Sequence, residues 1–206
     1  GGIGAVVLIL LAIIIIRTLM FKPEKLPELK AEPVTFNEDK IVADMVDMIR
    51  CKTVSNRDES LVDRGEFVKF EALLKERFPL IHEKCEFEKV GKTGLLYLLK
   101  GKASDKPSVC MAHYDVVPVE EEGWTKPAFE GLVEDGCIWG RGTLDTKGTL
   151  CGVMEALEQL LSEGYVPEND LYLSFSGEEE IDGDSCADIV SHLEKMGVKP
   201  AIVVDE

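Results

Sequence analysis

The stretch Gly140–Leu150 reads GRGTLDTKGTL and places Asp145 at the centre of a glycine-rich loop. Glycine lets a backbone turn sharply and approach other groups closely, so such a loop can hold one side chain in an unusual direction. A single acid in a loop of this kind is weak evidence of a functional site. The other loops of the chain therefore decide whether Asp145 belongs to one.

The composition limits the class of protein. The chain has 206 residues, enough for one domain with a proper core or for one and a half. Its formal net charge of −16 argues against nucleic acid as a partner, because phosphate binding needs a basic face. None of the six cysteines lies in a C-x-x-C pair, which excludes a zinc finger and a thioredoxin motif. A disulfide stays open, but the spacing indicates no pairing.

Residues 1–21 form an apolar N-terminal segment, and the run Ile3–Ile16 contains no charge. This length approaches the ~20 residues that span a bilayer, with Arg17 reaching the interface, and so predicts a single-pass transmembrane helix. The alternative is a signal peptide, but RTLMFKPEK at residues 17–25 offers no small-residue cleavage site. We therefore expect an uncleaved anchor, with the following domain lumenal, vacuolar or extracellular. Cleavage would make the protein secreted.

Beyond the apolar segment, residues 22–34 combine three prolines with charges and are typical of a linker. Residues 35–206 are expected to form one folded domain. Thr35 and Glu38 match a capping box that opens a helix, and a second helix is expected over residues 65–77. Residues 85–90 and 95–99, joined by a glycine-containing turn, predict a β-hairpin.

The rest of the chain alternates short apolar runs with helical patterns. Alternation of this kind predicts an α/β sandwich with a mixed, largely buried sheet. The expected strands are 108–112, 137–139, 171–175 and 201–204, and the expected helices are 150–161 and 187–196.

Acidic residues or a histidine follow each of these strands. Ligands bind at the carboxyl ends of the strands in open α/β sheets. One acid at such a place is commonly a helix cap or a solvated side chain, whereas four sets at equivalent strand ends indicate a shared site. These sets are His113 with Asp115, Asp145, the triple Glu178–Glu180, and Asp205 with Glu206.

Carboxylates packed together raise each other's pKa and need a strong counter-charge. No basic run lies nearby in the sequence, so a divalent metal is the expected source of that charge. Imidazole with carboxylates suits zinc, with cobalt or manganese as weaker candidates. One glutamate of the triple can then bind metal while its neighbour takes a proton from water, which is the division of roles in metal-assisted hydrolysis.

Five motifs carry a family resemblance. The chain resembles the zinc-dependent aminoacylase and carboxypeptidase S exopeptidases from about Thr35 to its end. It is most similar to the branch with the Gly-X carboxypeptidase and the N-fatty-acyl-amino-acid hydrolases. The motifs are AHYDVVP (112–118), GWTKPAF (123–129), GRGTLDTKG (140–148), EEEIDG (178–183) and VVDE (203–206).

The resemblance implies a zinc-exopeptidase-like sandwich with two Zn²⁺ ions and a role for each polar residue. By this resemblance, His113 and Asp205 bind the first ion and Glu180 binds the second. Asp145 bridges the two ions. Asp115 orients the imidazole and Glu179 is the general base.

Two choices within the motifs stay open. Aligning Glu178 with the aspartate of the family makes Glu179 the base, and the alternative register makes Glu178 the base and Glu179 a ligand. Relatives use either acid of the final pair, so Glu206 is the alternative to Asp205.

The implied function is hydrolysis of a peptide or N-acyl amide bond next to a free amino-acid carboxylate, by a metal-bound water activated by Glu179. The substrates would be small peptides or N-acyl amino acids. The family also uses a distal histidine and a lid or dimerisation domain, through which a homodimer would form. Both would lie beyond Glu206, so we expect the N-terminal part of a longer enzyme that is inactive alone. The alternative is a truncated, non-catalytic binding or decoy product of the same fold.

Overall fold

A computed structural model of the chain describes residues 2–23 and 34–206. The chain divides into two compact units, Gly1–Phe36 and Asn37–Glu206. The first contains helix α1 (Gly2–Met20), none of whose side chains is buried. Most of the predicted 22–34 linker, residues 24–33, lies outside the described residues.

Helix α1 is long and apolar enough to cross a membrane. Its 19 residues extend for about 28 Å at ~1.5 Å per residue, close to the ~30 Å hydrocarbon core of a bilayer. A signal sequence near the N-terminus has the same properties, so both predicted roles of this segment remain open.

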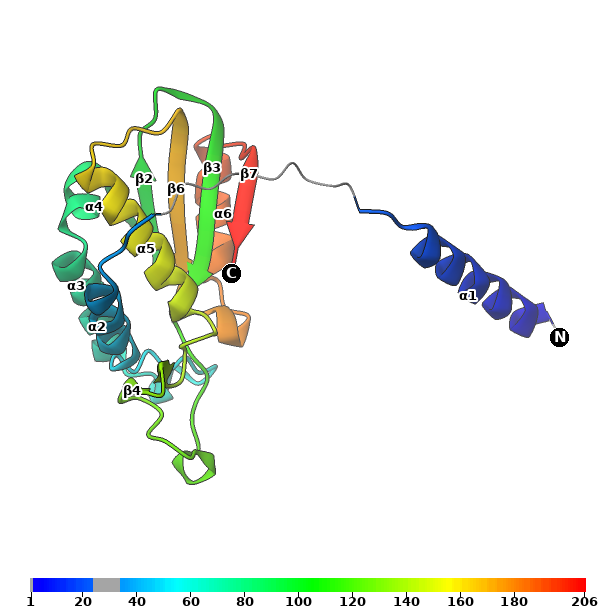
Figure 1. The fold of residues 1–206 in the computed structure, drawn as a ribbon, viewed down its shortest axis with the longest axis horizontal. Coiled ribbons are helices and arrows are strands. Elements are labelled where there is room, and N and C mark those ends of the chain that lie inside the picture. Colours follow the sequence, from blue (N-terminus) through cyan, green and yellow to red (C-terminus); the bar gives the residue numbers. More distant parts are fainter. Residues whose placement is uncertain (1, 24–33) are drawn as a thin grey trace. The chain divides into compact units, whose positions relative to one another are not determined.

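The second unit alternates strands and helices, as the sequence predicts (Figure 1). Its helices are α2 (Glu38–Ile49), α3 (Arg64–Arg77), α4 (Pro79–Lys84), α5 (Lys147–Ser162) and α6 (Ser185–Lys195), with 3₁₀ turns at Glu59–Leu61, Glu121–Gly123 and Glu179–Ile181. Its strands are β1 (Glu86–Val90), β2 (Gly94–Leu99), β3 (Ala103–His113), β4 (Leu132–Glu134), β5 (Cys137–Trp139), β6 (Asn169–Ser176) and β7 (Ile202–Asp205).

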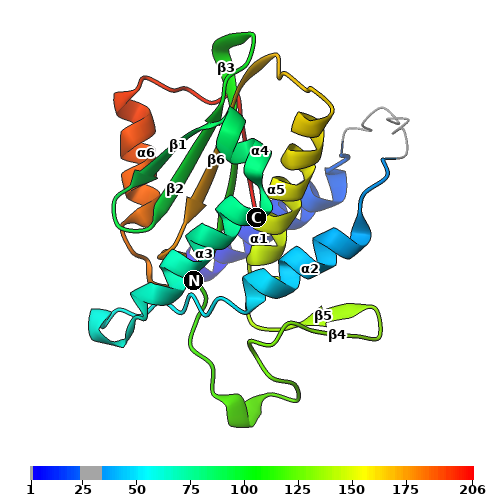
Figure 2. The same cartoon turned by 90° about the vertical axis from the view of Figure 1, so that its left-hand side faces the viewer.

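Five strands form the central sheet in the order β1-β2-β6-β3-β7. The pairs β1–β2 and β2–β6 are antiparallel, whereas β3 runs parallel to both β6 and β7. Helix α6 covers one face of the sheet, and α4 and α5 lie on the other (Figure 2). The mixed sheet of an α/β sandwich is therefore confirmed.

Strand β2 explains why the sheet needs helices on both faces. Its sequence GLLYLL is apolar throughout, and side chains of a strand alternate between the two faces. Leu95, Tyr97 and Leu99 enter the larger core, which α2 to α5 complete. Leu96 and Leu98 enter a smaller core with Ile189 and Leu193 of α6. Leu96, Leu98 and Ile189 are almost fully buried there.

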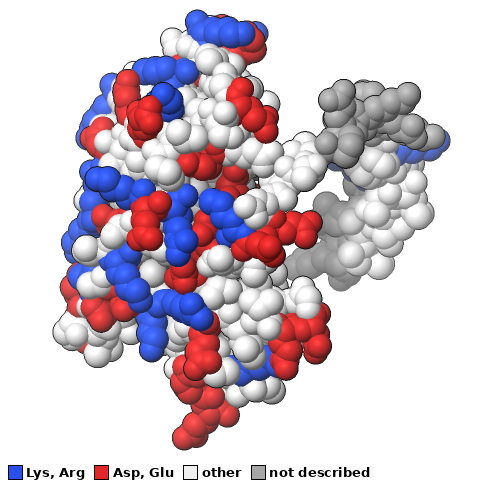
Figure 3. All heavy atoms as spheres, turned by 60° about the vertical axis from the view of Figure 1, so that its left-hand side comes forward, with Lys and Arg blue, Asp and Glu red and all other residues white. Residues whose placement is uncertain are grey.

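The surface of the unit mixes both signs of charge. Figure 3 shows Lys and Arg interspersed with Asp and Glu over one face, despite the acidic total. Buried carboxylates also pair with partly exposed cations, among them Asp44 with Arg77 at 3.5 Å and Glu155 with Lys40 at 2.9 Å. The negative charge of the chain is therefore partly balanced outside the loops that follow the strands.

The predicted hairpin and the helix at 65–77 are confirmed within one residue. Helix α2 begins at Glu38, two residues later than a Thr35 capping box predicts, because the side chain of Asn37 accepts a hydrogen bond from the Lys40 amide at 3.2 Å. Helix α5 begins at Lys147 rather than Leu150, so the loop that carries Asp145 leads directly into a helix.

Two strands exist as predicted, but one joins a different sheet and the other is exposed rather than buried. Strand β5 does not join the central sheet but pairs with β4 in a separate two-stranded sheet, so Asp145 does not follow a central strand. Strand β7 was expected to be buried, yet its four residues are exposed. It lies at the edge of the central sheet, where β3 is its sole strand neighbour among the described residues.

Candidate metal centre

His113 ends strand β3, and its ring is 1% exposed. Its Nδ1 lies 3.0 Å from the carbonyl oxygen of Asp115, which accepts a hydrogen bond from it. Its Nε2 lies 2.8 Å from Oδ1 of Asp145. Burial lowers the pKa of His113, but hydrogen bonds and negative charge from Asp115 and Asp145 outweigh it and raise this pKa to about 9. The surroundings of His113 therefore favour the positively charged imidazolium form of its side chain.

The Asp145 loop depends on glycine at two positions. Gly142 has φ +86°, a left-handed conformation that side chains disfavour. A Cβ on Gly148 would lie 2.3 Å from the carbonyl oxygen of Thr143, so the first turn of α5 needs glycine to pack against the loop. Asp145 itself projects from this constrained backbone, and its side chain is 69% exposed.

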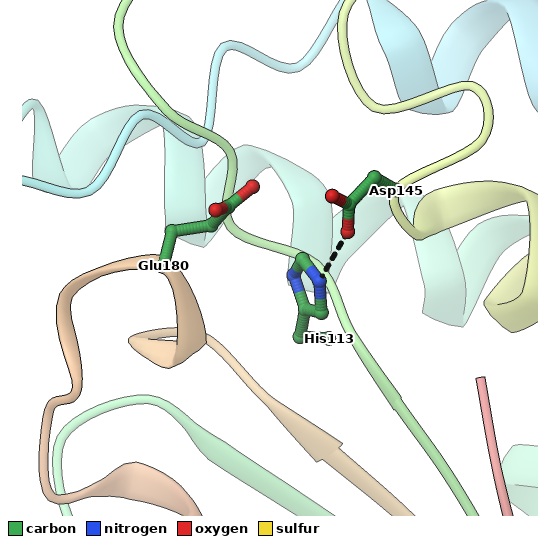
Figure 4. Close-up of side chains that lie close together, drawn as sticks. All are labelled: His113, Asp145 and Glu180. Carbon is green, nitrogen blue, oxygen red and sulfur yellow. Dashed lines mark hydrogen bonds and ion pairs between the residues drawn. The ribbon is translucent and has the colours of Figure 1, made fainter. Parts of the chain in front are cut away.

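The three consecutive glutamates have different surroundings, because the chain enters a 3₁₀ turn directly after Glu178. Glu178 is buried and forms an ion pair with Arg64 at 3.4 Å. Oε2 of Glu179 lies 3.7 Å from Nε2 of His113. The carboxylate of Glu180 extends toward the space beside His113 and Asp145 (Figure 4). Glu178 is thus engaged by a protein cation, and its two neighbours face the histidine.

His113, Asp145 and Glu180 form a group suited to a metal ion. One possible ligand atom from each residue lies within 4.8 Å of those of the other two (Figure 4). Within residues 2–23 and 34–206, no Lys or Arg forms an ion pair with Asp145 or Glu180. Burial and the charge of Asp145 raise the pKa of Glu180, as expected for carboxylates gathered without a counter-charge. An imidazole and two carboxylates are a donor set that fits zinc.

Asp205 and Glu206 both reach the neighbourhood of His113. With His113 and Glu179 they line one hollow of about 260 Å³. Asp205 pairs in register with Met111, two residues before the histidine. Oε1 of Glu206 lies 3.6 Å from Nε2 of His113. The geometry brings both acids to the site, so the choice between them as metal ligand stays a prediction.

Asp115 lies behind the cluster and is fully buried. Its carboxylate accepts hydrogen bonds from the backbone amides of Glu179 and Glu180 at 3.0 and 3.1 Å, and from the hydroxyl of Ser55 at 2.6 Å. Its main-chain carbonyl holds the imidazole of His113, with its carboxylate 3.5 Å from Nδ1. Asp115 therefore connects the histidine to the turn that carries the glutamates, and sequence reasoning missed Ser55.

Lys147 was also missed. The side chain is fully buried, and its ammonium donates to the carbonyl oxygens of Met48 at 3.1 Å and Cys51 at 2.7 Å. It also lies 5.2 Å from the centre of the Phe70 ring. Burial lowers the pKa of Lys147 to about 7. A lysine two residues after Asp145, at the start of an amphipathic helix, was the available signal, but a charged residue there is usually solvated.

The domain has helices on both faces of its central sheet, and beyond the end of β3 it gathers acids and a histidine that could hold a metal ion. Residues 109–205 match the profile of Peptidase family M20/M25/M40. These residues therefore carry a Peptidase M20 domain.

Relatives and a solved structure agree with this assignment. The chain is 38% identical over 140 residues to probable carboxypeptidase S-like 2 of Dictyostelium discoideum, covering 66% of this chain and 27% of the relative. It is 36% identical over 157 residues to the human N-fatty-acyl-amino acid synthase/hydrolase, covering 75% and 31%. An M20 family metallo-carboxypeptidase from Sulfolobus solfataricus shares the fold, with TM-score 0.64, 24% identity, and coverage of 81% and 37%. The chain thus spans about a third or less of the length of these two relatives.

Proposed function

We propose that this chain contributes most of a two-zinc site to a longer hydrolase that cleaves a peptide or N-acyl amide bond next to a free carboxylate. The observation that carries the proposal is the group of His113, Asp145 and Glu180, whose ligand atoms lie within 4.8 Å of one another. Relatives named as a carboxypeptidase S-like protein and an N-fatty-acyl-amino acid hydrolase support the substrate class.

In this proposal Asp145 would bind both ions. His113 and one acid of the final pair, Asp205 or Glu206, would hold one zinc, and Glu180 would hold the other. The exposure of Asp145 and its position beside the imidazole suit a carboxylate shared by two ions, because its side chain is 69% exposed. Cobalt or manganese would fit the same oxygen and nitrogen ligands less well.

Zinc in such a site supplies a Lewis acid for the substrate carbonyl and lowers the pKa of water. Glu179 is the proposed general base, since it faces the imidazole without serving in the three-residue group. Burial and the nearby acids raise the pKa of Glu179, which brings it nearer to the value that suits proton transfer at neutral pH. It would take a proton from water and pass it to the departing amine. Glu178, held by Arg64, is less suited to this role.

The test is Glu179→Gln in the proposed longer hydrolase. General-base catalysis contributes roughly 10²–10⁴-fold, so kcat should fall by at least about 100-fold. Zinc content should stay unchanged, because Glu179 is not a ligand. The matched control is Glu178→Gln, which should keep most of the turnover. Near-normal activity of the Glu179 variant, with loss in the Glu178 variant, would reverse the register.

Residues 1–21 are proposed to anchor this enzyme in a membrane, with 22–34 as a linker and 35–206 as the first part of the catalytic domain. The exposed apolar surface of α1 supports the anchor. N-terminal sequencing of the mature protein and extraction of membranes with alkaline carbonate distinguish an uncleaved anchor from a cleaved signal peptide. An intact N-terminus that resists extraction supports the anchor, and a new N-terminus beyond residue 21 in a soluble fraction supports a signal peptide.

A further inference from the structure

The segment Thr53–Ser55 packs against the chain that follows β3. Val54 forms a parallel bridge with Val116. The Ser55 amide donates to the Val116 carbonyl at 3.1 Å, and the Val116 amide donates to the Thr53 carbonyl at 3.0 Å. The hydroxyl of Thr53 donates to the carbonyl of Tyr114. This segment, which begins four residues after α2 ends, therefore runs as a short extra strand beside Tyr114–Val116.

Ser55 is the residue of this segment that reaches the metal centre from behind. It is 2% exposed, and its hydroxyl lies 2.6 Å from Oδ2 of Asp115. The same Oδ2 accepts the amide of Glu180, whereas Oδ1 accepts the amide of Glu179. Because a carboxylate with no water around it depends on protein donors for its orientation, removing one donor frees it to rotate.

We propose that Ser55 is a positioning residue for the Glu179–Glu180 turn, acting through the carboxylate of Asp115. The hydroxyl of Ser55 orients this carboxylate so that its two oxygens meet the two consecutive amides. The amides, in turn, set where the side chains of Glu179 and Glu180 leave the backbone. The inference on the turn stands on these contacts alone, and its extension to metal binding rests on the proposed function.

Amide hydrogen exchange in the metal-free 206-residue chain, held in a mild detergent, tests the first step. A hydrogen bond to a charged group contributes about 1.5–3 kcal/mol, so Ser55→Ala should speed exchange at the amides of Glu179 and Glu180 by about tenfold or more. Thr53→Val is the matched control, because it removes a buried hydroxyl from the same segment without touching Asp115. It should leave the exchange of these two amides unchanged relative to the amides of β6.

The second readout is Co²⁺ binding followed by visible absorption. Misplaced supporting groups cost metal sites about 10–100-fold in affinity, so Ser55→Ala should bind Co²⁺ at least about tenfold more weakly, with altered bands. Thr53→Val should keep the bands of the parent chain. Ser55→Cys, which keeps a weak donor of similar size, should fall between the parent and the alanine variant, and it serves if Ser55→Ala does not fold.

The outcomes separate the two proposals. Unchanged exchange at Glu179 and Glu180 in Ser55→Ala, or the same increase in Thr53→Val, overturns the role of Ser55. If the parent chain binds no Co²⁺ while exchange responds as expected, the positioning role stands and the proposed metal site fails.

Discussion

Asp115 and Asp145 lie on opposite sides of His113, and the protein treats them in contrasting ways. Asp115 is fully buried and receives hydrogen bonds from a hydroxyl and two backbone amides. Asp145 is 69% exposed, and among the described residues its carboxylate forms a hydrogen bond or ion pair with the imidazole alone. One carboxylate is held by the fold, and the other projects from it.

This difference indicates that Asp115 supports the structure of the site, whereas Asp145 is suited to bind a metal ion. A buried carboxylate that is fully hydrogen-bonded holds its neighbours in place and has little capacity left for a ligand. An exposed carboxylate beside other acids, without Lys or Arg, has unused acceptor capacity and a like-charge cost that a cation removes. We therefore expect changes at Asp115 to affect folding and metal binding together, and changes at Asp145 to affect metal binding alone.

The largest effect is expected from Asp115→Ala. This variant leaves the Ser55 hydroxyl and two amides without their acceptor, and unsatisfied buried donors cost about 1–3 kcal/mol each. The free energy of unfolding of the metal-free chain should fall by at least about 3 kcal/mol, measured by chemical denaturation followed by near-ultraviolet circular dichroism. A loss below about 1 kcal/mol would mean that water replaces the carboxylate and that Asp115 is not a support.

Asp145→Asn should show the opposite pattern. Zn²⁺ affinity should fall by about 100-fold or more, because the variant loses the charge of a ligand, whereas the metal-free stability should change by less than about 0.5 kcal/mol, as is usual for exposed sites. Competition with a chromophoric chelator measures the affinity. Asp135→Asn in the turn between β4 and β5 is the control, and equal affinity loss in both variants would contradict a role for Asp145 as ligand.

Lys147→Met tests whether the first turn of α5 is held from within the core. It removes two hydrogen bonds to backbone carbonyls, so the free energy of unfolding should fall by about 1–3 kcal/mol. Burial lowers the folded-state pKa from 10.5 to about 7, so the unfolded chain binds more protons than the folded chain between these values. The contribution of Lys147 to stability therefore rises from pH 7 to pH 10.5. The parent-minus-variant difference should carry this slope, and a flat difference would contradict the lowered pKa.

The smallest effect is expected at Glu155, a carboxylate matched by a protein cation. It contacts Lys40 at 2.9 Å, while burial and a hydrogen bond with Asp44 raise its pKa above the ordinary value of 4.5. Since its folded-state pKa is raised, its contribution is greatest below pH 4.5 and declines as the pH rises through that value. Glu155→Gln should remove this decline and change stability at pH 7 by less than about 1 kcal/mol in unfolding titrations. A loss of Zn²⁺ affinity would contradict the separation of this network from the site.

Most of the fold was predictable from local pattern. The continuous apolar run of β2, the turn before it and the helical spacing in α3 depend on neighbours in the chain, and each was placed within one residue. The setting of β5 was not predictable, because three apolar residues join whichever partner the tertiary fold brings near. Here that partner is β4.

The candidate site was likewise predictable in its residue types but not in its geometry. The residue types of His113, Asp145 and Glu180 indicated metal chemistry in the sequence, because an imidazole and carboxylates placed after separate apolar runs are donors that zinc accepts. Their approach to within 4.8 Å required the sheet that aligns β3 with β6 and the packing of α5 against α2.

The sequence by itself determined the alternation of strands and helices, the apolar N-terminal helix and the set of acids available for a site. Only the tertiary structure decided that Ser55 contacts Asp115 and that Lys147 is buried against the end of α2. Their hydroxyl and ammonium groups have no local partner and bond to acceptors 60 and 96 or more residues away in the chain. Such contacts arise from packing, whereas helix and strand patterns arise from neighbours along the backbone.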